Sequence, residues 1–169
     1  MSLELQIIIC STRPGRVGPT VARWFHGFSL QHGRFHAKLI DLCDFKLSLF
    51  DEPNHPRLQK YEHEHTKRWS ASVATADAFV FVTPEYNYCP PPGFGNALNY
   101  LYNEWNYKAC GFVSYAGPSG GLRAVQLEKQ LEHIDDPAVL TDVVAHTCLQ
   151  DSEQRQEVFE VFEVPIFLV

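Results

Sequence analysis

Short apolar runs alternate with amphipathic stretches along most of the chain. Residues 5–10 are apolar and rich in β-branched side chains, which predicts a buried strand. Polar residues, glycine and proline dominate residues 11–19, which predicts a loop. Apolar residues then recur at helical spacing, at Val17, Val21, Trp24, Phe25 and Phe28. The chain therefore opens with a strand, a polar loop and an amphipathic helix.

The same alternation predicts the architecture of the rest of the chain. Further strands are expected at 35–42, 78–82 and 109–115, and the second of these is almost wholly apolar, as in a strand covered on both faces. Three more helices are expected from apolar stripes at Leu58, Tyr61, His65, Trp69 and Val73, at Phe94, Leu98, Leu101, Tyr102 and Trp105, and at Leu122, Val125, Leu131 and Ile134. Residues 139–148 fit either a strand or a helix, and residues 157–169 look strand-like. Strands alternating with helices indicate an α/β protein with a parallel sheet, helices on both of its faces and right-handed crossovers.

The bulk composition narrows the class of protein. The chain has 169 residues, of which 45% are hydrophobic, so it suits one domain with a full core. A formal net charge of -6 argues against broad nucleic-acid binding, and no apolar run reaches the roughly 18 residues of a membrane span. Five widely spaced cysteines without a CxxC pair argue against a disulfide framework and a zinc site. Residues 1–4 lack the layout of a signal peptide, so we expect a protein of the reducing cytoplasm.

Three loops of unusual composition follow the first, third and fourth predicted strands. In a parallel sheet of this kind, such loops meet at the carboxyl edge of the strands, where ligands bind. The first loop offers the hydroxyls of Ser11 and Thr12, the guanidinium groups of Arg13 and Arg16, and the amino end of the following helix, which together suit a phosphate. It is neither a Walker A loop nor GxGxxG. The alternative is a solvated turn with two surface arginines.

The second and third loops carry weaker signals. Residues 83–93 contain prolines that stiffen the loop and two tyrosines that could flank a flat ring. The alternative is a rigid crossover with surface tyrosines. Residues 116–121 are rich in glycine, which lets backbone amides approach a ligand closely. The alternative there is an ordinary turn.

Taken together, the three loops resemble those of the NADPH-dependent FMN reductase family, which includes quinone, chromate and azo-dye reductases. The resemblance runs from about residue 5 to residue 131, and its most specific part is Thr83-Pro84-Glu85-Tyr86-Asn87, followed by Asn96-Ala97-Leu98. It implies a flavodoxin-like fold: a doubly wound parallel sheet of five strands in three α/β/α layers, formed by a single domain over residues 1–169.

The family resemblance also implies roles for individual residues. Ser11, Arg13 and Arg16 would hold the FMN phosphate, with Thr12 and Gly18 in the same cofactor-binding loop. The isoalloxazine ring would be lined by Pro84, Glu85, Tyr86 and Asn87, and its pyrimidine end by Ser114, Gly117, Gly120 and Gly121.

The same resemblance implies a reaction and partners. Such an enzyme takes hydride from NADPH or NADH onto flavin N5 and passes it to a small acceptor such as a quinone or free flavin. It uses no metal and no dedicated catalytic side chain. By analogy with the family, we expect a homodimer or a tetramer, with no nucleic-acid or membrane partner.

The chain departs from the family pattern in three places. The family usually has Lys-Asn-Ala-x-Asp where this chain has Gly95-Asn96-Ala97-Leu98-Asn99, so any contact made by that lysine or aspartate is lost. Three consecutive prolines, at 90–92, could shift the tyrosine-containing loop. Residues 135–169 match the family poorly, and the usual closing helix is missing from the pattern.

Functions of a different class remain open on the sequence. Cys10-x5-Arg16 has the spacing of a phosphatase loop, and Asp136-Pro137 could supply the general acid of a low-molecular-weight phosphatase. The chain could also be an FMN electron carrier, or a degenerate family member that binds no flavin. His63 and His65 suggest a metal site, but on a helix they would point to different sides, which favours a solvated helix face.

Overall fold

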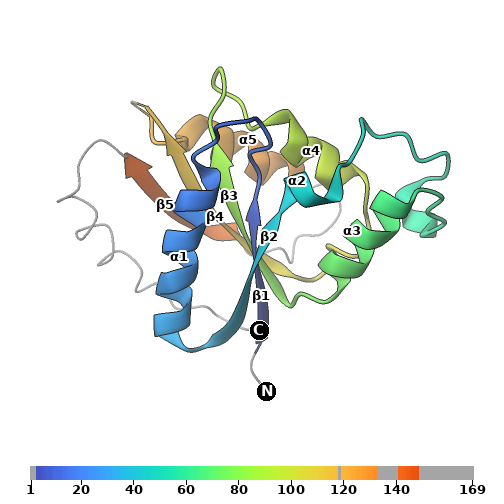
Figure 1. Ribbon diagram of the computed structural model, residues 1–169, viewed down its shortest axis with the longest axis horizontal. Coiled ribbons are helices and arrows are strands. Elements are labelled where there is room, and N and C mark those ends of the chain that lie inside the picture. The colour runs from blue at the N-terminus through green and yellow to red at the C-terminus, as the bar shows by residue number, and fades with distance from the viewer. Residues whose placement is uncertain (1–2, 118, 133–140, 149–169) are drawn as a thin grey trace.

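Five parallel strands form the centre of the molecule (Figure 1). The computed structural model describes residues 3–117, 119–132 and 141–148. The strands are β1 (Leu3–Ile9), β2 (Phe35–Asp41), β3 (Ala78–Pro84), β4 (Ala109–Ala116) and β5 (Thr141–Cys148). Their order in the sheet is β2-β1-β3-β4-β5. The predicted doubly wound parallel sheet is therefore confirmed, and the segment left open between strand and helix is the edge strand β5.

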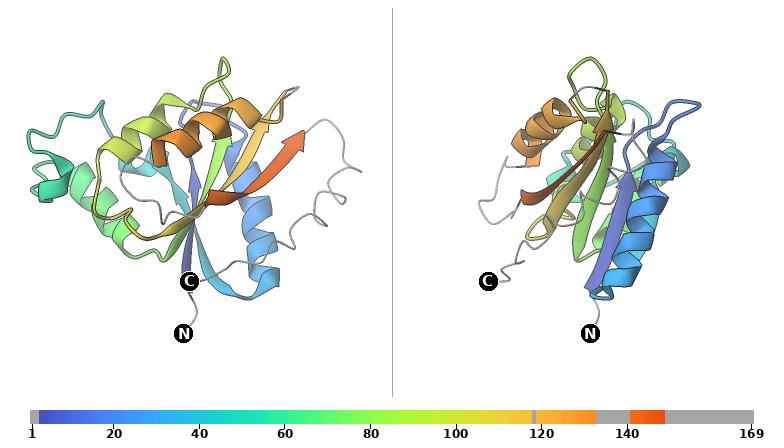
Figure 2. Two further views of the ribbon diagram at one scale, coloured as in Figure 1. Left: turned by 180° about the vertical axis from the view of Figure 1, so that it is seen from behind. Right: turned by 90° about the vertical axis from the view of Figure 1, so that its left-hand side faces the viewer.

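Helices cover both faces of this sheet (Figure 2). They are α1 (Gly18–His32), α2 (Leu42–Phe45), α3 (Glu64–Ala74), α4 (Pro92–Asn99) and α5 (Leu122–Glu132), with a 3₁₀ turn, η1, at Pro56–Leu58. Among the described helices, α1 lies on one face, and α3, α4 and α5 lie on the other. None of the helices in the described part of the chain is long and apolar enough to cross a membrane.

Alternate residues of the central strands feed two separate cores. Phe79 and Phe81 of β3 join Trp69 of α3 and Phe94 of α4 in one core. Val82 belongs to the other core, which α1 covers. Because both faces are buried, β3 is apolar from Ala78 to Val82, as the sequence indicated.

Two helices are shorter than their apolar stripes predicted. The stripe from Leu58 to Val73 is split, because Glu52 accepts hydrogen bonds from the backbone amides of Glu62 and His63, at 2.8 and 3.0 Å, and holds that segment extended. The structure begins α3 only at Glu64.

The third predicted helix also ends early. In the structure α4 ends at Asn99, and the chain turns where the buried carboxylate of Glu104 accepts from the amide of Tyr102, at 3.3 Å. Trp105 lies beyond the helix but still packs edge-on against Phe79, with ring centroids 5.1 Å apart. The apolar periodicity thus predicted correctly that this stretch packs on the core, but it predicted a helix longer than the one in the structure. Ile134 and residues 157–169, whose structure was also predicted, lie outside the described residues.

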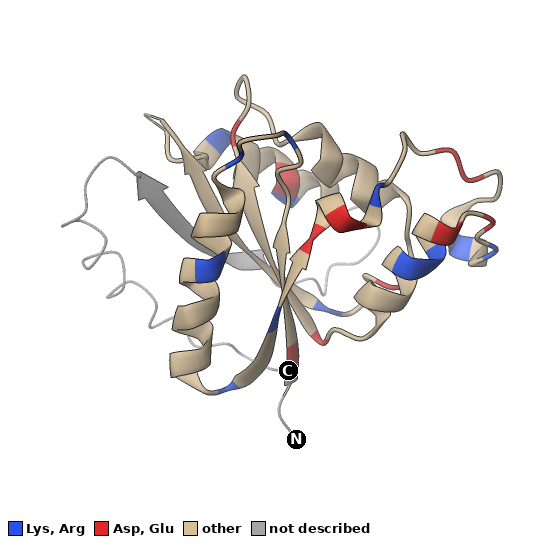
Figure 3. Ribbon diagram, viewed as in Figure 1, with Lys and Arg blue, Asp and Glu red and all other residues tan. Residues whose placement is uncertain are grey.

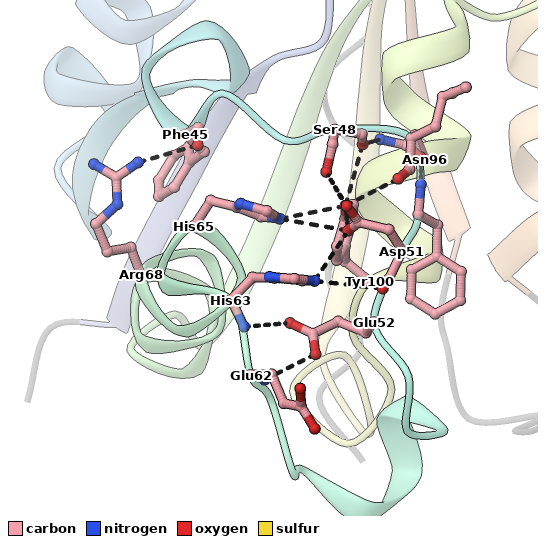
Figure 4. A network of polar contacts seen from close by, with 12 residues as sticks. Phe45, Ser48, Asp51, Glu52, Glu62, His63, His65, Arg68, Asn96 and Tyr100 are labelled. Carbon is pink, nitrogen blue, oxygen red and sulfur yellow. Dashed lines mark hydrogen bonds and ion pairs between the residues drawn. The ribbon is translucent and has the colours of Figure 1, made fainter.

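The prediction that His63 and His65 diverge is wrong. His63 precedes α3 in an extended conformation, so helical spacing does not apply to the pair. Their rings stack at 5.2 Å, and both Nε2 atoms approach Oδ1 of Asp51, at 3.6 and 3.9 Å (Figure 4). The hydroxyl of Tyr100 donates to the same carboxylate at 2.8 Å. This network ties the connection between α2 and α3 to the end of α4.

Candidate functional site

The three loops singled out in the sequence meet at the carboxyl edge of β1, β3 and β4, which are neighbours in the sheet. The first loop touches the second, because the guanidinium carbon of Arg13 lies 5.9 Å from the centre of the Tyr86 ring. The first loop also packs on the start of α4, where a Cβ on Gly93 would lie 3.2 Å from Thr12 Cγ2. The loops are thus parts of one surface.

Glu85 joins the second loop to the third. Its carboxylate accepts from the hydroxyl of Ser119, at 2.8 Å, and from the backbone amide of Arg123, at 3.0 Å, so it caps the amino end of α5. Only 6% of the Glu85 side chain is exposed. Burial opposes ionisation, but these hydrogen bonds outweigh it and hold the pKa of Glu85 below its ordinary value. The residue is therefore a charged cap rather than a proton donor.

The tyrosine-containing loop is a tight hairpin. The amide of Tyr86 donates to the carbonyl of Cys89, at 2.9 Å, and the reverse bond measures 3.0 Å. Asn87 and Tyr88 occupy the centre of the turn with φ of 51° and 65°, the geometry of a type I′ turn. The exposed ring of Tyr88 is covered by Arg123, whose guanidinium carbon lies 4.3 Å from the ring centre.

The proline run after this hairpin starts a helix. Pro91 is extended and serves as the N-cap, and Pro92 is the first residue of α4. Proline suits that first position because its fixed φ matches the helix and its missing N–H is not needed there. Pro91 and Pro92 therefore set where α4 begins.

The third loop depends on its glycines. Gly120 and Gly121 have φ of 59° and 94°, a region that side chains disfavour. A Cβ on Gly121 would lie 2.6 Å from Cβ of Ser114. The hydroxyl of Ser114 donates to the carbonyl of Gly120 at 2.8 Å. Ser114 thus shapes the loop from beneath, whereas Gly117 is exposed.

The first loop contains polar groups whose bonding capacity is not used. The buried hydroxyls of Ser11 and Tyr115 lie beside each other, and neither has a partner in good hydrogen-bond geometry among the described residues. Both lie against Gly18 at the start of α1, where a Cβ would overlap Ser11 Oγ and lie 2.9 Å from the Tyr115 hydroxyl. Burial raises the pKa of Tyr115 to about 12, so it stays protonated. The sequence alone assigns no role to Tyr115; its place at the end of β4 was the available signal.

Arg16 is placed differently from Arg13. Its two terminal nitrogens bind the Asp41 carboxylate and the Cys43 sulfur, and its side chain is 18% exposed. Its Nε is buried and has no hydrogen-bond partner among the described residues. Figure 3 shows basic positions in the first loop and acidic positions at the junction of β2 and α2 on the same edge of the sheet. Arg13 is exposed at the rim, whereas Arg16 is half-buried behind it.

The geometry does not support the phosphatase alternative. Cys10 is fully buried within the core beneath α3 and α4, with Sγ 3.5 Å from the carbonyl oxygen of Ile8. A nucleophilic thiolate needs access and a cationic partner, and the terminal nitrogens of Arg16 bind elsewhere. Asp136, the proposed general acid, lies outside the described residues.

A separate cavity of about 740 Å³ lies near the amino ends of the strands. Phe79 and Cys110, near the starts of β3 and β4, line it together with Leu98 and Trp105. Its lining is mainly apolar, and the three loops do not reach it. We therefore place the candidate site at the loops, where charged and unsatisfied polar groups gather.

Comparison with known proteins decides the family. The family model described as NADPH-dependent FMN reductase matches residues 3–148. The chain belongs to this family. A Schizosaccharomyces pombe protein named NAD(P)H-dependent FMN reductase is 42% identical over 127 residues, which cover 74% of this chain and 64% of that protein. A Saccharomyces cerevisiae protein of the same name is 30% identical over 140 residues, covering 76% of this chain and 73% of that protein. The match thus spans slightly less than two thirds of the first relative's length.

Solved structures agree on the fold of this FMN reductase family member. FerB, a flavoenzyme NAD(P)H:(acceptor) oxidoreductase from Paracoccus denitrificans, superimposes with a TM-score of 0.66 at 18% identity. The match covers 94% of this chain and 92% of FerB. At that identity the likeness supports the flavodoxin-like architecture, and the chemistry is argued from this chain's own residues.

Proposed function

We propose that this chain binds FMN at the three loops and acts as an NAD(P)H-dependent reductase. When bound, FMN would supply the redox chemistry, taking hydride from NADPH or NADH at N5 and yielding it to a small acceptor such as a quinone or free flavin. Family membership supports the cofactor, and the loop geometry supports its location.

One observation carries the proposal: buried donors in the first loop lack partners. The Ser11 hydroxyl and Arg16 Nε are buried without hydrogen bonds among the described residues, which is costly unless a ligand completes them. They lie at the amino end of α1, whose first turn contains no acidic residue and favours an anion. A phosphate matches this donor set, with Thr12 and Arg13 at the rim. Because Gly18 has no side chain, the start of α1 can lie close to the Ser11 hydroxyl.

The other two loops would hold the ring. In this proposal the hairpin at Pro84, Glu85, Tyr86 and Asn87 lines one side, and Ser114, Gly117, Gly120 and Gly121 bracket the pyrimidine end. Their rigid backbone suits this task, because preorganised donors bind a ligand at a lower entropic cost. Glu85 contributes by holding the hairpin against α5.

A titration tests the cofactor assignment. Purified protein mixed with FMN should quench its fluorescence and hold it through gel filtration, with absorbance near ~450 nm. Riboflavin, which lacks the phosphate, should bind at least about tenfold more weakly, since several charge-assisted bonds are missing. Protein that takes up no FMN would refute the proposal.

Turnover then separates a reductase from a carrier. Loaded protein should oxidise NADPH or NADH in the presence of a quinone, and omission of FMN is the control. FMN binding without such turnover would favour an electron carrier. Hydrolysis of an aryl phosphate that is lost in Cys10→Ser would favour the phosphatase.

We also propose a homodimer in the cytoplasm. Exposed apolar side chains such as Leu49, which is 85% exposed, and Leu58 are candidates for subunit contacts. Cys43 and Cys89 form no disulfide among the described residues, which suits a reducing compartment. Light scattering that gave a monomer would contradict the first proposal, and fractionation of cells tests the second.

A further inference from the structure

The guanidinium group of Arg16, in the first loop, contacts two residues that the sequence analysis did not associate with it. Asp41 ends β2, and Cys43 lies in the first turn of α2. Both contact the terminal nitrogens of the Arg16 guanidinium, across 25 and 27 residues of sequence. The arrangement brings the edge strand β2 into the candidate phosphate site.

We propose that Asp41 and Cys43 are positioning residues for phosphate binding, because they fix Arg16 so that its Nε–H is presented to the anion. The inference rests on the proposed FMN function and extends it to a pair of residues outside the three loops.

The bonding of Asp41 supports a fixed geometry. One carboxylate oxygen accepts from the backbone amide of Cys43, at 3.0 Å, and caps α2, while the other binds Arg16. A carboxylate anchored by a helix terminus cannot follow a moving guanidinium, so Arg16 is held where Asp41 stands.

Cys43 adds a second anchor. Its sulfur accepts from Arg16, and its thiol donates to the carbonyl of Thr12, at 3.3 Å. Burial raises the pKa of Cys43, which keeps the thiol protonated and able to donate at neutral pH. The same sulfur therefore joins the arginine to the backbone of the phosphate loop.

The third guanidinium nitrogen of Arg16, Nε, indicates the kind of ligand. With both terminal nitrogens engaged, Nε is the guanidinium donor that is left buried without a hydrogen bond to the described residues. Ser11 in the same loop has an equally unsatisfied hydroxyl. A phosphate oxygen is the acceptor chemistry that both groups call for.

The direction in which FMN affinity changes when the charge of Asp41 is removed tests the inference. Asp41 is an anion near a phosphate, so simple repulsion predicts that Asp41→Asn would tighten FMN binding. If Asp41 instead holds Arg16 in place for the phosphate, the same substitution should weaken FMN binding. We expect Asp41→Asn to weaken FMN binding about tenfold, the effect of one misplaced charge-assisted hydrogen bond, and to change riboflavin binding less than about twofold.

Two cysteine variants and a matched control complete the experiment. Cys43→Ala should weaken FMN binding about threefold or more, and Cys43→Ser, which keeps a donor and an acceptor, should recover most of it. Both cysteine variants leave the Asp41 cap intact, so they stay informative if Asp41→Asn folds poorly. Lys38→Ala removes another ion pair between β1 and β2, to Glu4 at 2.8 Å, and should leave both flavin affinities unchanged.

The outcomes separate this inference from the proposed function. Tighter FMN binding by Asp41→Asn would overturn the positioning role. So would equal losses of affinity for FMN and riboflavin, which leave the ratio of the two dissociation constants unchanged. Either result would leave the proposed FMN function standing. Wild-type protein that binds neither flavin would remove both.

Discussion

At the scale of single residues, the two arginines of the first loop have different tasks. Arg13 is exposed and contacts Tyr86 at the rim of the candidate site, whereas Arg16 is half-buried and bound to Asp41 and Cys43. Exposed charges act through screened attraction, and half-buried ones also hold neighbouring structure together.

Single substitutions should separate these tasks. Arg13→Ala should weaken FMN binding several-fold, in a salt-dependent way, without changing the melting temperature. Arg16→Ala should weaken FMN binding and also lower the free energy of unfolding by about 1–2 kcal/mol, since Asp41 loses a partner. Fluorescence titration and thermal melts measure both. Equal effects of the two substitutions on stability would contradict the distinction.

Gly18 is the residue at which the packing leaves no room. We expect Gly18→Ala to cost about 1–3 kcal/mol of stability and to abolish tight FMN binding, because the new methyl group overlaps Ser11 Oγ. Gly27→Ala in the same helix is the matched control. A Cβ there meets nothing within 4 Å, so the change should be neutral or stabilising by up to about 1 kcal/mol. Chemical denaturation distinguishes the two.

At the scale of elements, the site depends on how loops are tied to helices. Glu85 holds the tyrosine hairpin to α5, and Pro91 and Pro92 fix the start of α4. These ties explain how loops with two positive-φ residues in one turn stay ordered.

The α5 cap should leave a signature in the pH dependence of stability. The pKa of Glu85 is depressed in the folded state, so its contribution is present above the unfolded pKa, near 4.5, and is lost as pH falls through the lower folded value. Glu85→Gln should therefore destabilise the protein by about 1 kcal/mol at pH 7, with a difference that shrinks toward pH 3. Melting temperatures of both proteins across that range test this. A difference that grows on acidification would exclude the ionised cap.

At the scale of the whole molecule, the long connection between α2 and α3 is secured separately from the site. Asp51, His63, His65 and Tyr100 form its anchor, and Asn96 adds hydrogen bonds to the backbone of Ser48 and Phe50 at 2.6 and 2.9 Å. Asn96 belongs to the segment that resembles the family, and here it has a structural role.

Removing one hydroxyl should loosen this anchor. Tyr100→Phe deletes a buried donor to Asp51, and we expect a loss of about 1–2 kcal/mol with faster proteolysis of the connection. Tyr107→Phe is the control, because that side chain is 79% exposed and should be silent. If both variants melted alike, the Asp51 network would not be holding the connection.

The sequence by itself determined the order of strands and helices, the two-sided burial of β3 and the three loops at one edge. The spacing of apolar residues along the chain indicates whether a segment is a helix or a strand and which of its faces is buried. It misjudged α3 and α4, because the limits of these helices depend on two carboxylates. Glu52 accepts from the backbone amide of Glu62, ten residues along the chain, and Glu104 accepts from the nearby amide of Tyr102 and from the distant hydroxyls of Tyr61 and Ser70.

Only the tertiary structure decided which side chains meet. Strand order brings Asp41 and Cys43 to Arg16 and places the Tyr115 hydroxyl beside Ser11. The folding of the connection between α2 and α3 brings both histidines to Asp51. Hydrogen bonds between distant segments depend on register and rotamer, which no spacing along the chain records. The residue types of the candidate site could therefore be predicted from the sequence, whereas the different environments of Arg13 and Arg16 could not.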